Sequence, residues 1–322
     1  MKGDSLTGSI WEHLKPRQHA IEAALGNTLR RLCVDTPTVL ADAMGYSLLA
    51  PGKRLRPLLV VLACEAAGGS QGQAMPAACA VEMVHTYSLI HDDLPAMDDD
   101  DLRRGLPTCH MKYGEALAIL AGDALLTMAF EVLGQGYGPK TVAVGCVELA
   151  RGAGANGMVG GQVLDLEAEE RFTAPGEPAT LVAGCAAPAQ GSARLEDIHR
   201  RKTGALFRAA LRLGVFAAQA ETDDGVSTKT LAAIDRYAAA FGLAFQVTDD
   251  LLDVESSAEQ TGKRVGKDAA RGKLTYPGLL GVEASRRKAQ ELGQDAVTAA
   301  GQLGPSGHPL AELARYVVQR DR

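Results

Sequence analysis

Long alanine- and leucine-rich stretches place polar residues at helical spacing along most of the chain, and no segment sustains an alternation of apolar and polar positions. This pattern predicts helices rather than strands. We expect helices, with bounds accurate to a few residues, at 8–32, 38–49, 55–68, 75–92, 114–134, 139–152, 156–170, 195–220, 226–255, 276–303 and 309–320. Because several of these segments are apolar on more than one side, they predict an all-α bundle with a buried central layer.

Prolines and glycines mark where several of these helices begin and end. Thr36-Pro37 fits an N-cap followed by proline at the first helical position, and Pro277 and Pro309 mark similar starts. Glycines that follow apolar stretches are expected to stop helices, at Gly68, Gly69, Gly134 and Gly136.

The chain has 322 residues, of which 46% are hydrophobic, which is enough for a large core. This length allows one large domain or two modest ones, and we expect a single domain over residues 1–322. The sequence contains no repeat of 20–50 residues. Between Thr173 and Ala193 the composition shifts to prolines, glycines and small residues with one charge. This segment predicts a flexible surface loop rather than a domain boundary.

Charge and cysteine content exclude several functional classes. The formal net charge of −6 gives no support to binding of nucleic acid or of an anionic membrane. The six cysteines form no CxxC pair, so they predict reduced thiols rather than a disulfide frame or a zinc site. Residues 1–16 contain no apolar signal-peptide core, and the apolar run 58–64 is too short to span a bilayer. We expect a cytoplasmic protein without stable membrane insertion.

The richest chemistry lies where the helix 75–92 ends. An apolar run stops at Asp92 and Asp93, Asp98 follows beyond a proline, and Arg103-Arg104 come next. Clustered carboxylates repel each other and need compensation, which a hard cation such as Mg²⁺ supplies together with phosphate oxygens. Guanidinium groups bind phosphate in a bidentate fork. The stretch predicts a metal–diphosphate site, and the alternative is a solvated acidic turn.

A second copy of this chemistry disfavours the alternative. Residues 245–253 again end an apolar run in Asp249 and Asp250, with Asp253 one turn later. Asp249 and Asp253 share a helix face at i and i+4, where like charges destabilise a bare helix. A bound cation is therefore the expected reason for their spacing.

Several separate cationic segments accompany the acidic clusters. Residues 52–57, Gly-Lys-Arg-Leu-Arg-Pro, either cap a helix C-terminus or form an anion pocket in which Lys53 and Arg56 grip a phosphate. His85 lies two turns before Asp92, roughly 10 Å along the axis, and is either structural or a hydrogen-bonding partner of the diphosphate. Lys202 lies either in a solvated basic turn or over a ligand.

Two more segments also allow either a structural or a ligand-binding interpretation. Gly160-Gly161-Gln162 would permit close packing or approach of a ligand, and Gln162 and Asp165 either line a cavity or bond to each other. The lysine- and glycine-rich residues 261–277 suit a mobile flap over phosphate oxygens or a solvated surface. Together with the acidic helix ends in an apolar bundle, they favour a substrate that carries a diphosphate and a hydrocarbon tail.

The motifs, in this order, resemble those of the trans-isoprenyl diphosphate synthase (polyprenyl synthetase) family, and within it the bacterial farnesyl diphosphate synthases. The matching segments are 52–57, 92–98 with four residues between the aspartate pair and the third aspartate, 160–162, 202–204, 249–253 and 272–277. The segment 173–193 looks longer than is usual in the family. The resemblance implies the all-α isoprenoid-synthase fold, Mg²⁺ as cofactor, isopentenyl and allylic diphosphates as substrates, and a homodimer.

The resemblance also implies a role for each matched residue. Asp92, Asp98 and Asp249 would ligate magnesium. Arg103, Lys202 and Lys263 would bind the allylic diphosphate. Lys53, Arg56, His85 and Arg104 would bind isopentenyl diphosphate. Thr203 and Gln246 would flank the carbocation, Lys273 would help a closing flap, and Tyr87 and Ser88 would limit chain length.

The expected product is (2E,6E)-farnesyl diphosphate, made from isopentenyl diphosphate with dimethylallyl and geranyl diphosphate by ionisation, condensation and elimination. Tyr87 precedes Asp92 by five residues, roughly 7–8 Å along the helix, so its ring would form the floor of the tail pocket. The alternatives are a geranylgeranyl diphosphate synthase, a class I terpene cyclase and a non-catalytic synthase subunit. A cyclase would carry an Asn/Ser/Glu-rich second motif, and such a subunit typically loses motif aspartates.

Overall fold

The computed structural model describes residues 6–169, 171–172, 188–259 and 274–320. The chain divides into two compact units. We name them after their central helices: the α4 unit comprises Trp11–Leu149 and Ala210–Ser227, and the α11 unit comprises Met1–Ile10, Ala150–Ala209 and Thr228–Arg322. The division falls within three helices, α1 (Leu6–Leu32), α7 (Pro139–Ala153) and α10 (Ala205–Gln219). The predicted single domain is not tested by this division and stays a prediction.

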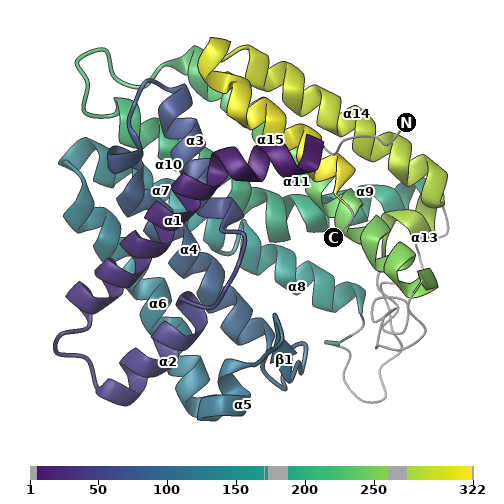
Figure 1. The fold of residues 1–322 in the computed structure, drawn as a ribbon. Helices are drawn as coiled ribbons and strands as arrows, with labels where there is room; N and C mark the ends of the chain where they lie inside the picture. Colours follow the sequence, from purple (N-terminus) through teal and green to yellow (C-terminus); the bar gives the residue numbers. More distant parts are fainter. Residues whose placement is uncertain (1–5, 170, 173–187, 260–273, 321–322) are drawn as a thin grey trace. The chain divides into compact units, whose positions relative to one another are not determined.

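The α4 unit is built around the helix that ends in the first aspartate pair. This central helix is α4 (Gln71–Asp92). The other helices wholly within the unit are α2 (Thr38–Leu48), α3 (Leu55–Ala66), α5 (Cys109–Tyr113) and α6 (Glu115–Gly136). Helix α4 packs against α3, α6 and α2, and α6 also contacts α2 and α5 (Figure 1). With neighbours on several sides, α4 is buried along most of its length, which fixes the position of its C-terminal end.

Two helices of this unit, α3 and α6, are strongly apolar. Residues 58–64 of α3 are buried, each with a relative exposure of 1% or less, so this apolar run is core. Helix α6 is, among the residues the structure describes, the one helix long and apolar enough to cross a membrane, with a mean hydropathy of 1.8. A core helix meets the same criterion, and 44% of this stretch is buried. Length and composition alone therefore do not assign α6 to a membrane.

The α4 unit also contains a small hairpin that the hydrophobic pattern does not predict. Strands β1 (Leu102–Arg103) and β2 (Leu106–Pro107) pair antiparallel. The two residues between them, Arg104 and Gly105, have φ values of +54° and +78°. Positive φ at both central positions is the geometry of the two-residue hairpin turns that match strand twist. The turn therefore sets the direction of both arginines of the first motif.

The α11 unit consists of helices alone in its described part. Its elements are α8 (Met158–Ala168), α9 (Pro188–His199), the π-helical turn η1 (Arg200–Gly204), α11 (Thr228–Glu259), α13 (Tyr276–Leu280), α14 (Val282–Gly301), the 3₁₀ turn η2 (Gly304–Gly307) and α15 (His308–Gln319). Helix α14 packs against α11, α13 and α15 (Figure 1), and η1 contacts α8, α9 and α11. Leu195, Val247, Tyr276 and Ala289 belong to one buried cluster that joins four of these helices.

The predicted all-α class is confirmed across the described residues, and most predicted helices agree within a few residues. Some details were wrong. Helix α4 begins at Gln71 because Ser70 and Gln73 form a capping box. Pro37, not Thr36, is the N-cap of α2. The predicted helix 276–303 is broken at Gly281, which has a φ of +80°.

Two further predictions need correction. Helix α6 continues through Gly134 to Gly136, so Gly134 is not a stop. The predicted loop 173–193 is partly wrong, because α9 begins at Pro188; residues 173–187 lie outside the described part.

Candidate active site

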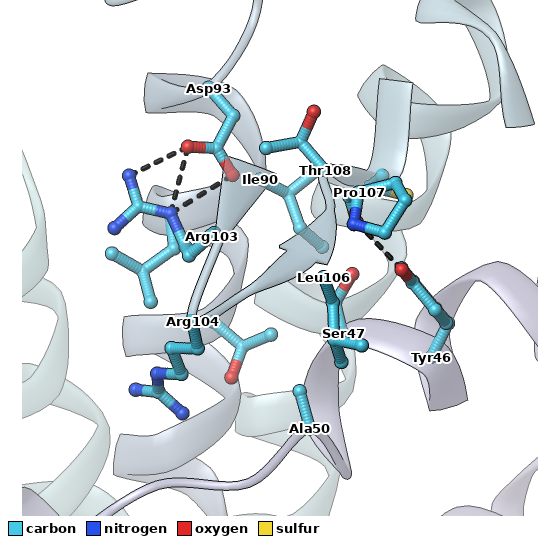
Figure 2. A pocket seen from close by; sticks show the side chains of 13 residues that line it. Tyr46, Ser47, Ala50, Ile90, Asp93, Arg103, Arg104, Leu106, Pro107 and Thr108 are labelled. Atoms are coloured by element: carbon cyan, nitrogen blue, oxygen red, sulfur yellow. Dashed lines mark hydrogen bonds and ion pairs between the residues drawn. The ribbon is translucent and has the colours of Figure 1, made fainter. Parts of the chain in front are cut away.

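The first acidic helix end separates two neighbouring carboxylates. Asp92 is the last residue of α4 and is half-buried, whereas the Asp93 side chain is only 5% exposed. Arg103 Nε donates to both Asp93 oxygens, at 2.8 and 3.0 Å, and Arg103 Nη2 lies 2.6 Å from Oδ1 (Figure 2). Burial raises the pKa of the Asp93 carboxyl, and the hydrogen bonds from Arg103 oppose that rise. Asp93 therefore holds an arginine in the interior, and the half-buried Asp92 is the more exposed carboxylate of the pair.

The turn after α4 folds back onto the helix end. The Asp98 N–H donates to the Asp92 carbonyl at 2.8 Å, and the Asp100 N–H donates to the Asp93 carbonyl at 3.3 Å. The Asp98 side chain is half-buried. The proline and the four-residue spacing thus bring the third aspartate of the motif back to the first, as a shared cation requires.

A cavity of about 50 Å³ lies beside the Asp93–Arg103 pair. Tyr46, Leu106 and Cys109 are among its lining residues, and Tyr46 Oη donates to the Pro107 carbonyl at 2.6 Å (Figure 2). A space of this size holds a few water molecules and no prenyl diphosphate. We assign it to the support of the hairpin rather than to the substrate.

The basic loop 51–57 is joined to the hairpin by Arg104. Arg104 Nη1 donates to the Pro51 carbonyl at 2.7 Å. The guanidinium lies so close to Gly52 that a Cβ atom there would collide with it. A larger residue at this position would push the Arg104 guanidinium aside, and the exposed Lys53 follows directly. The structure thus brings together two of the cations expected to bind isopentenyl diphosphate.

The sequence predicted a phosphate role for Arg56 and gave no role to its neighbour Arg54. Arg54 has a φ of +53°, is 4% exposed, and forms an ion pair with the buried Glu82 at 2.8 Å. It also donates to the Ala50 carbonyl at 2.7 Å, so it anchors the loop onto α4. Arg56 instead lies 3.1 Å from His85 Nε2.

His85 is a neutral partner for Arg56. Burial, followed by the charges of Arg56 and Arg104, lowers the pKa of His85 well below its ordinary value. A neutral imidazole can accept a hydrogen bond from a guanidinium at Nε2, and the tautomer is inferred from that contact. The predicted residues Arg56 and His85 are therefore in direct contact, and the charge of Arg104 acts on them.

The two predicted chain-length residues lie on α4. The Tyr87 ring is 6% exposed and contacts His91 edge-on, with ring centroids 5.8 Å apart. Burial raises the pKa of Tyr87 to about 12. Ser88 Oγ donates to the His85 carbonyl at 2.8 Å. Tyr87 is thus a packed aromatic one and a half turns before the acidic helix end.

In the α11 unit, the neighbouring aspartates Asp249 and Asp250 of the second motif also differ in burial and in their partners. Asp250 is buried and its Oδ2 accepts the Tyr276 N–H at 2.9 Å. The Asp249 side chain is 42% exposed and is paired with Arg320. Arg320 lies 4.1 Å over the Phe245 ring and is only 8% exposed. Sequence reasoning missed Arg320, which is 71 residues from Asp249 and carries no local signal.

Lys202 and Thr203 lie in the π-helical turn η1, a type of distortion found often at functional sites. Lys202 Nζ lies 2.5 Å from Asp165 Oδ2, so Asp165 bonds to this lysine rather than to Gln162 as one interpretation had it. A Cβ atom at Gly161 would collide with the Lys202 backbone, so the glycine pair of α8 permits close packing. Thr203 is buried, and Gln246 on α11 is half-buried.

The predicted Lys263 and Lys273 lie outside the described residues. Within the described ranges, no three His, Cys, Asp or Glu side chains gather closely enough to hold a metal ion by themselves. Mg²⁺ is usually bound by one or two carboxylates, water and substrate phosphates, and the half-buried oxygens of Asp92 and Asp98 fit that donor set.

Comparison with known proteins defines the class. The chain is 48% identical to farnesyl diphosphate synthase of Escherichia coli (strain K12), over 89% of this chain and 91% of that protein. It is 47% identical to the chloroplastic geranylgeranyl pyrophosphate synthase 9 of Arabidopsis thaliana, over 88% of this chain and 75% of that protein. These similarities place it among the prenyltransferases that make trans-prenyl diphosphates.

The family follows from a direct match. The polyprenyl synthetase model matches residues 37–301, and the chain belongs to that family. Its fold matches the crystal structure of a geranyltransferase from Legionella pneumophila, with a TM-score of 0.80, 31% identity, and coverage of 98% of this chain and 99% of that one. The crystal structure of an FPP/GFPP synthase from Zymomonas mobilis also matches, with a TM-score of 0.74 and 33% identity, and coverage of 94% of this chain and 99% of that one. The predicted isoprenoid-synthase fold is confirmed.

Proposed function

We propose that this prenyl diphosphate synthase makes (2E,6E)-farnesyl diphosphate by adding isopentenyl diphosphate to dimethylallyl and then geranyl diphosphate. The buried Tyr87 ring carries this proposal, because it lies about 7–8 Å before the Asp92 helix end that would anchor the diphosphate. A packed ring is costly to displace, so it supports a short tail pocket. Identity to the Escherichia coli enzyme supports the same product.

The second candidate product is geranylgeranyl diphosphate, which the similarity to the Arabidopsis thaliana synthases favours. Those relatives are about as similar to this chain as the Escherichia coli enzyme is, so similarity alone does not separate the two products. The buried Tyr87 ring is the observation that supports farnesyl diphosphate.

In this proposal Asp92, Asp98 and Asp249 hold Mg²⁺, which when bound neutralises the diphosphate as it departs. Arg103, fixed by Asp93, offers its remaining N–H groups to the allylic diphosphate, together with Lys202 and Lys263. Arg56, His85, Arg104 and Lys53 bind isopentenyl diphosphate. Thr203 and Gln246 flank the allylic cation, and Lys273 helps to exclude water. We also propose a homodimer in the cytoplasm.

Product analysis tests this function. The purified protein is incubated with isopentenyl and dimethylallyl diphosphates and Mg²⁺, and the dephosphorylated products are separated by chromatography. We expect farnesol as the main product. Geranylgeraniol as the main product would support the second candidate, and a hydrocarbon released without phosphatase would contradict both.

A further inference from the structure

The second carboxylate of the second aspartate motif, Asp250, is turned into the protein. Asp250 is 7% exposed, whereas the side chain of its neighbour Asp249 is 42% exposed. Successive side chains on an α-helix point about 100° apart, so the two carboxylates of α11 cannot face the same side. A buried carboxylate is costly unless it is bonded, which raises the question of what Asp250 holds.

One partner is the beginning of α13. Asp250 Oδ2 accepts the backbone N–H of Tyr276, at 2.9 Å. Tyr276 is the first residue of α13, and the first N–H groups of a helix have no partner within it. The Tyr276 ring is 1% exposed, so this contact lies in the interior of the α11 unit. Asp250 therefore fixes the beginning of α13 against α11.

The other neighbour of this oxygen is His199. His199 Nε2 lies 3.6 Å from Asp250 Oδ2, beyond hydrogen-bond distance but close enough for the carboxylate charge to orient the ring. The imidazole stacks on Tyr276, with centroids 5.8 Å apart and an interplanar angle of 19°. Among the described residues, Nε2 is buried without a hydrogen-bond partner. The three side chains form one buried cluster.

His199 connects this cluster to the turn that carries the proposed catalytic residues. It is the residue directly before η1, which contains Lys202 and Thr203. Close packing at Gly161 on α8 and at Gly242 on α11 leaves little space around η1. A change in the His199 ring would therefore move the backbone of the turn, and displacements of about 1 Å are enough to lower a rate strongly.

We propose that Asp250 is a positioning residue and not a magnesium ligand: through Tyr276 and His199 it holds the beginning of α13 and the turn η1 in register with α11. This inference rests on the proposed function, in which Lys202 and Thr203 act on the allylic substrate. Asp250 acts through these residues and touches no substrate.

Hydrogen exchange measured by mass spectrometry tests the positioning without any turnover. In the full-length protein without substrates, Asp250→Ala is expected to speed exchange at least about tenfold in the segments 199–206 and 274–280. Asp249→Ala and Asp235→Ala are matched controls on the same helix, since Asp235 is a half-buried aspartate whose carboxylate pairs with the exposed Arg208 at 3.0 Å. Neither control should change exchange in those two segments.

Kinetics then separate positioning from metal binding. We expect Asp250→Ala to lower kcat about 10- to 100-fold at an unchanged half-saturating Mg²⁺ concentration, whereas Asp249→Ala raises that concentration. Asp250→Asn keeps an acceptor for the Tyr276 N–H and should recover part of kcat, and it replaces Asp250→Ala if that variant fails to fold.

The proposal is overturned if exchange in both segments is unchanged, or if an Asp250 variant raises the half-saturating Mg²⁺ concentration as much as Asp249→Ala does. If the wild-type protein makes no prenyl diphosphate, the proposed function fails instead, and the exchange result still decides the role of Asp250.

Discussion

Neighbouring residues of the same type have different roles in this chain, and burial separates them. Asp92 and Asp98 are half-buried at the end of α4, while Asp93 is buried against Arg103. Arg54 is buried against Glu82, while Arg56 contacts His85. In each case the buried residue is paired with a buried or half-buried partner and holds the local structure, and our proposal gives the ligand role to its more exposed neighbour.

The two arginines of the basic loop give a paired prediction. Arg56→Ala should raise KM for isopentenyl diphosphate about 10- to 100-fold, because it removes a charge-assisted hydrogen bond, and leave KM for dimethylallyl diphosphate unchanged. Arg54→Ala leaves Glu82 buried and unpaired, so it should lower the free energy of unfolding by about 3–5 kcal/mol. Steady-state kinetics and urea unfolding measure the two effects. Equal changes in both KM values for Arg56→Ala would contradict its assignment.

His85 predicts a pH dependence of stability. Its pKa is lowered in the folded protein, so the unfolded chain binds the proton more readily and folding stability rises with pH. The contribution is full above the ordinary pKa of about 6.5 and is lost as the pH falls below it, by up to about 1.4 kcal/mol for each pH unit. Urea unfolding between pH 7.5 and 5 should therefore show a smaller loss of stability for His85→Gln than for the wild type. An identical loss in both proteins would mean that folding leaves the pKa of His85 unchanged, which would contradict the prediction.

At the scale of elements, the sequence pattern is informative where the signal is local. Helical periodicity located nearly all helices, because each amphipathic pattern is contained in its own segment. The capping box at Ser70 is also local and was readable, since Ser70 and Gln73 have the required spacing. The hairpin at Leu102–Pro107 was missed because its turn, Arg104-Gly105, lacks the usual Asn-Gly pair.

Long-range contacts were not predictable in the same way. The motifs identified Lys202, Asp249 and Arg103, but not the partners that hold them, which are Asp165, Arg320 and Asp93. A left-handed residue such as Arg54 reverses the direction of the chain locally, and composition does not reveal that. The candidate site was therefore predicted as a set of residues, and its support became visible only in the fold.

We propose that Tyr87 on helix α4 limits the chain length of the product, and substitution of Tyr87 tests this proposal. Tyr87→Ala removes the buried ring and should shift the main product from farnesyl diphosphate to geranylgeranyl diphosphate or longer, with a loss of about 3 kcal/mol in stability from the cavity. Chromatography of the dephosphorylated products measures the shift. Tyr87→Phe is the matched control and should keep the fifteen-carbon product. A Tyr87→Ala profile that still ends at farnesol would locate the floor of the tail pocket elsewhere.

The packing of α8 against η1 gives a prediction at the same scale. Gly161→Ala places a Cβ atom against the Lys202 backbone, so η1 must shift, and we expect kcat to fall about tenfold or more. Gly134→Ala on α6 is the matched control. Its Cβ atom meets nothing within 4 Å, so it should leave kcat unchanged and add up to about 1 kcal/mol of stability. Unchanged kcat in Gly161→Ala would show that the position of η1 does not limit the reaction.

At the scale of the whole molecule, each compact unit contains one aspartate cluster and its own cations. The α4 unit contains Asp92, Asp98 and the basic loop, and the α11 unit contains Asp249 and Lys202. The polyprenyl synthetase match, at residues 37–301, includes all of these residues. The proposed function therefore uses residues from both units.

The central claim is that both aspartate clusters, at the end of α4 and within α11, hold the magnesium required to ionise the allylic diphosphate. The most direct measurement is the turnover of Asp92→Ala and of Asp249→Ala with isopentenyl and dimethylallyl diphosphates at saturating Mg²⁺, with circular dichroism to verify the helical fold. We predict that each variant loses at least about two orders of magnitude in kcat while its helix content stays near that of the wild type. A variant of either residue that keeps most of the wild-type turnover would contradict the claim.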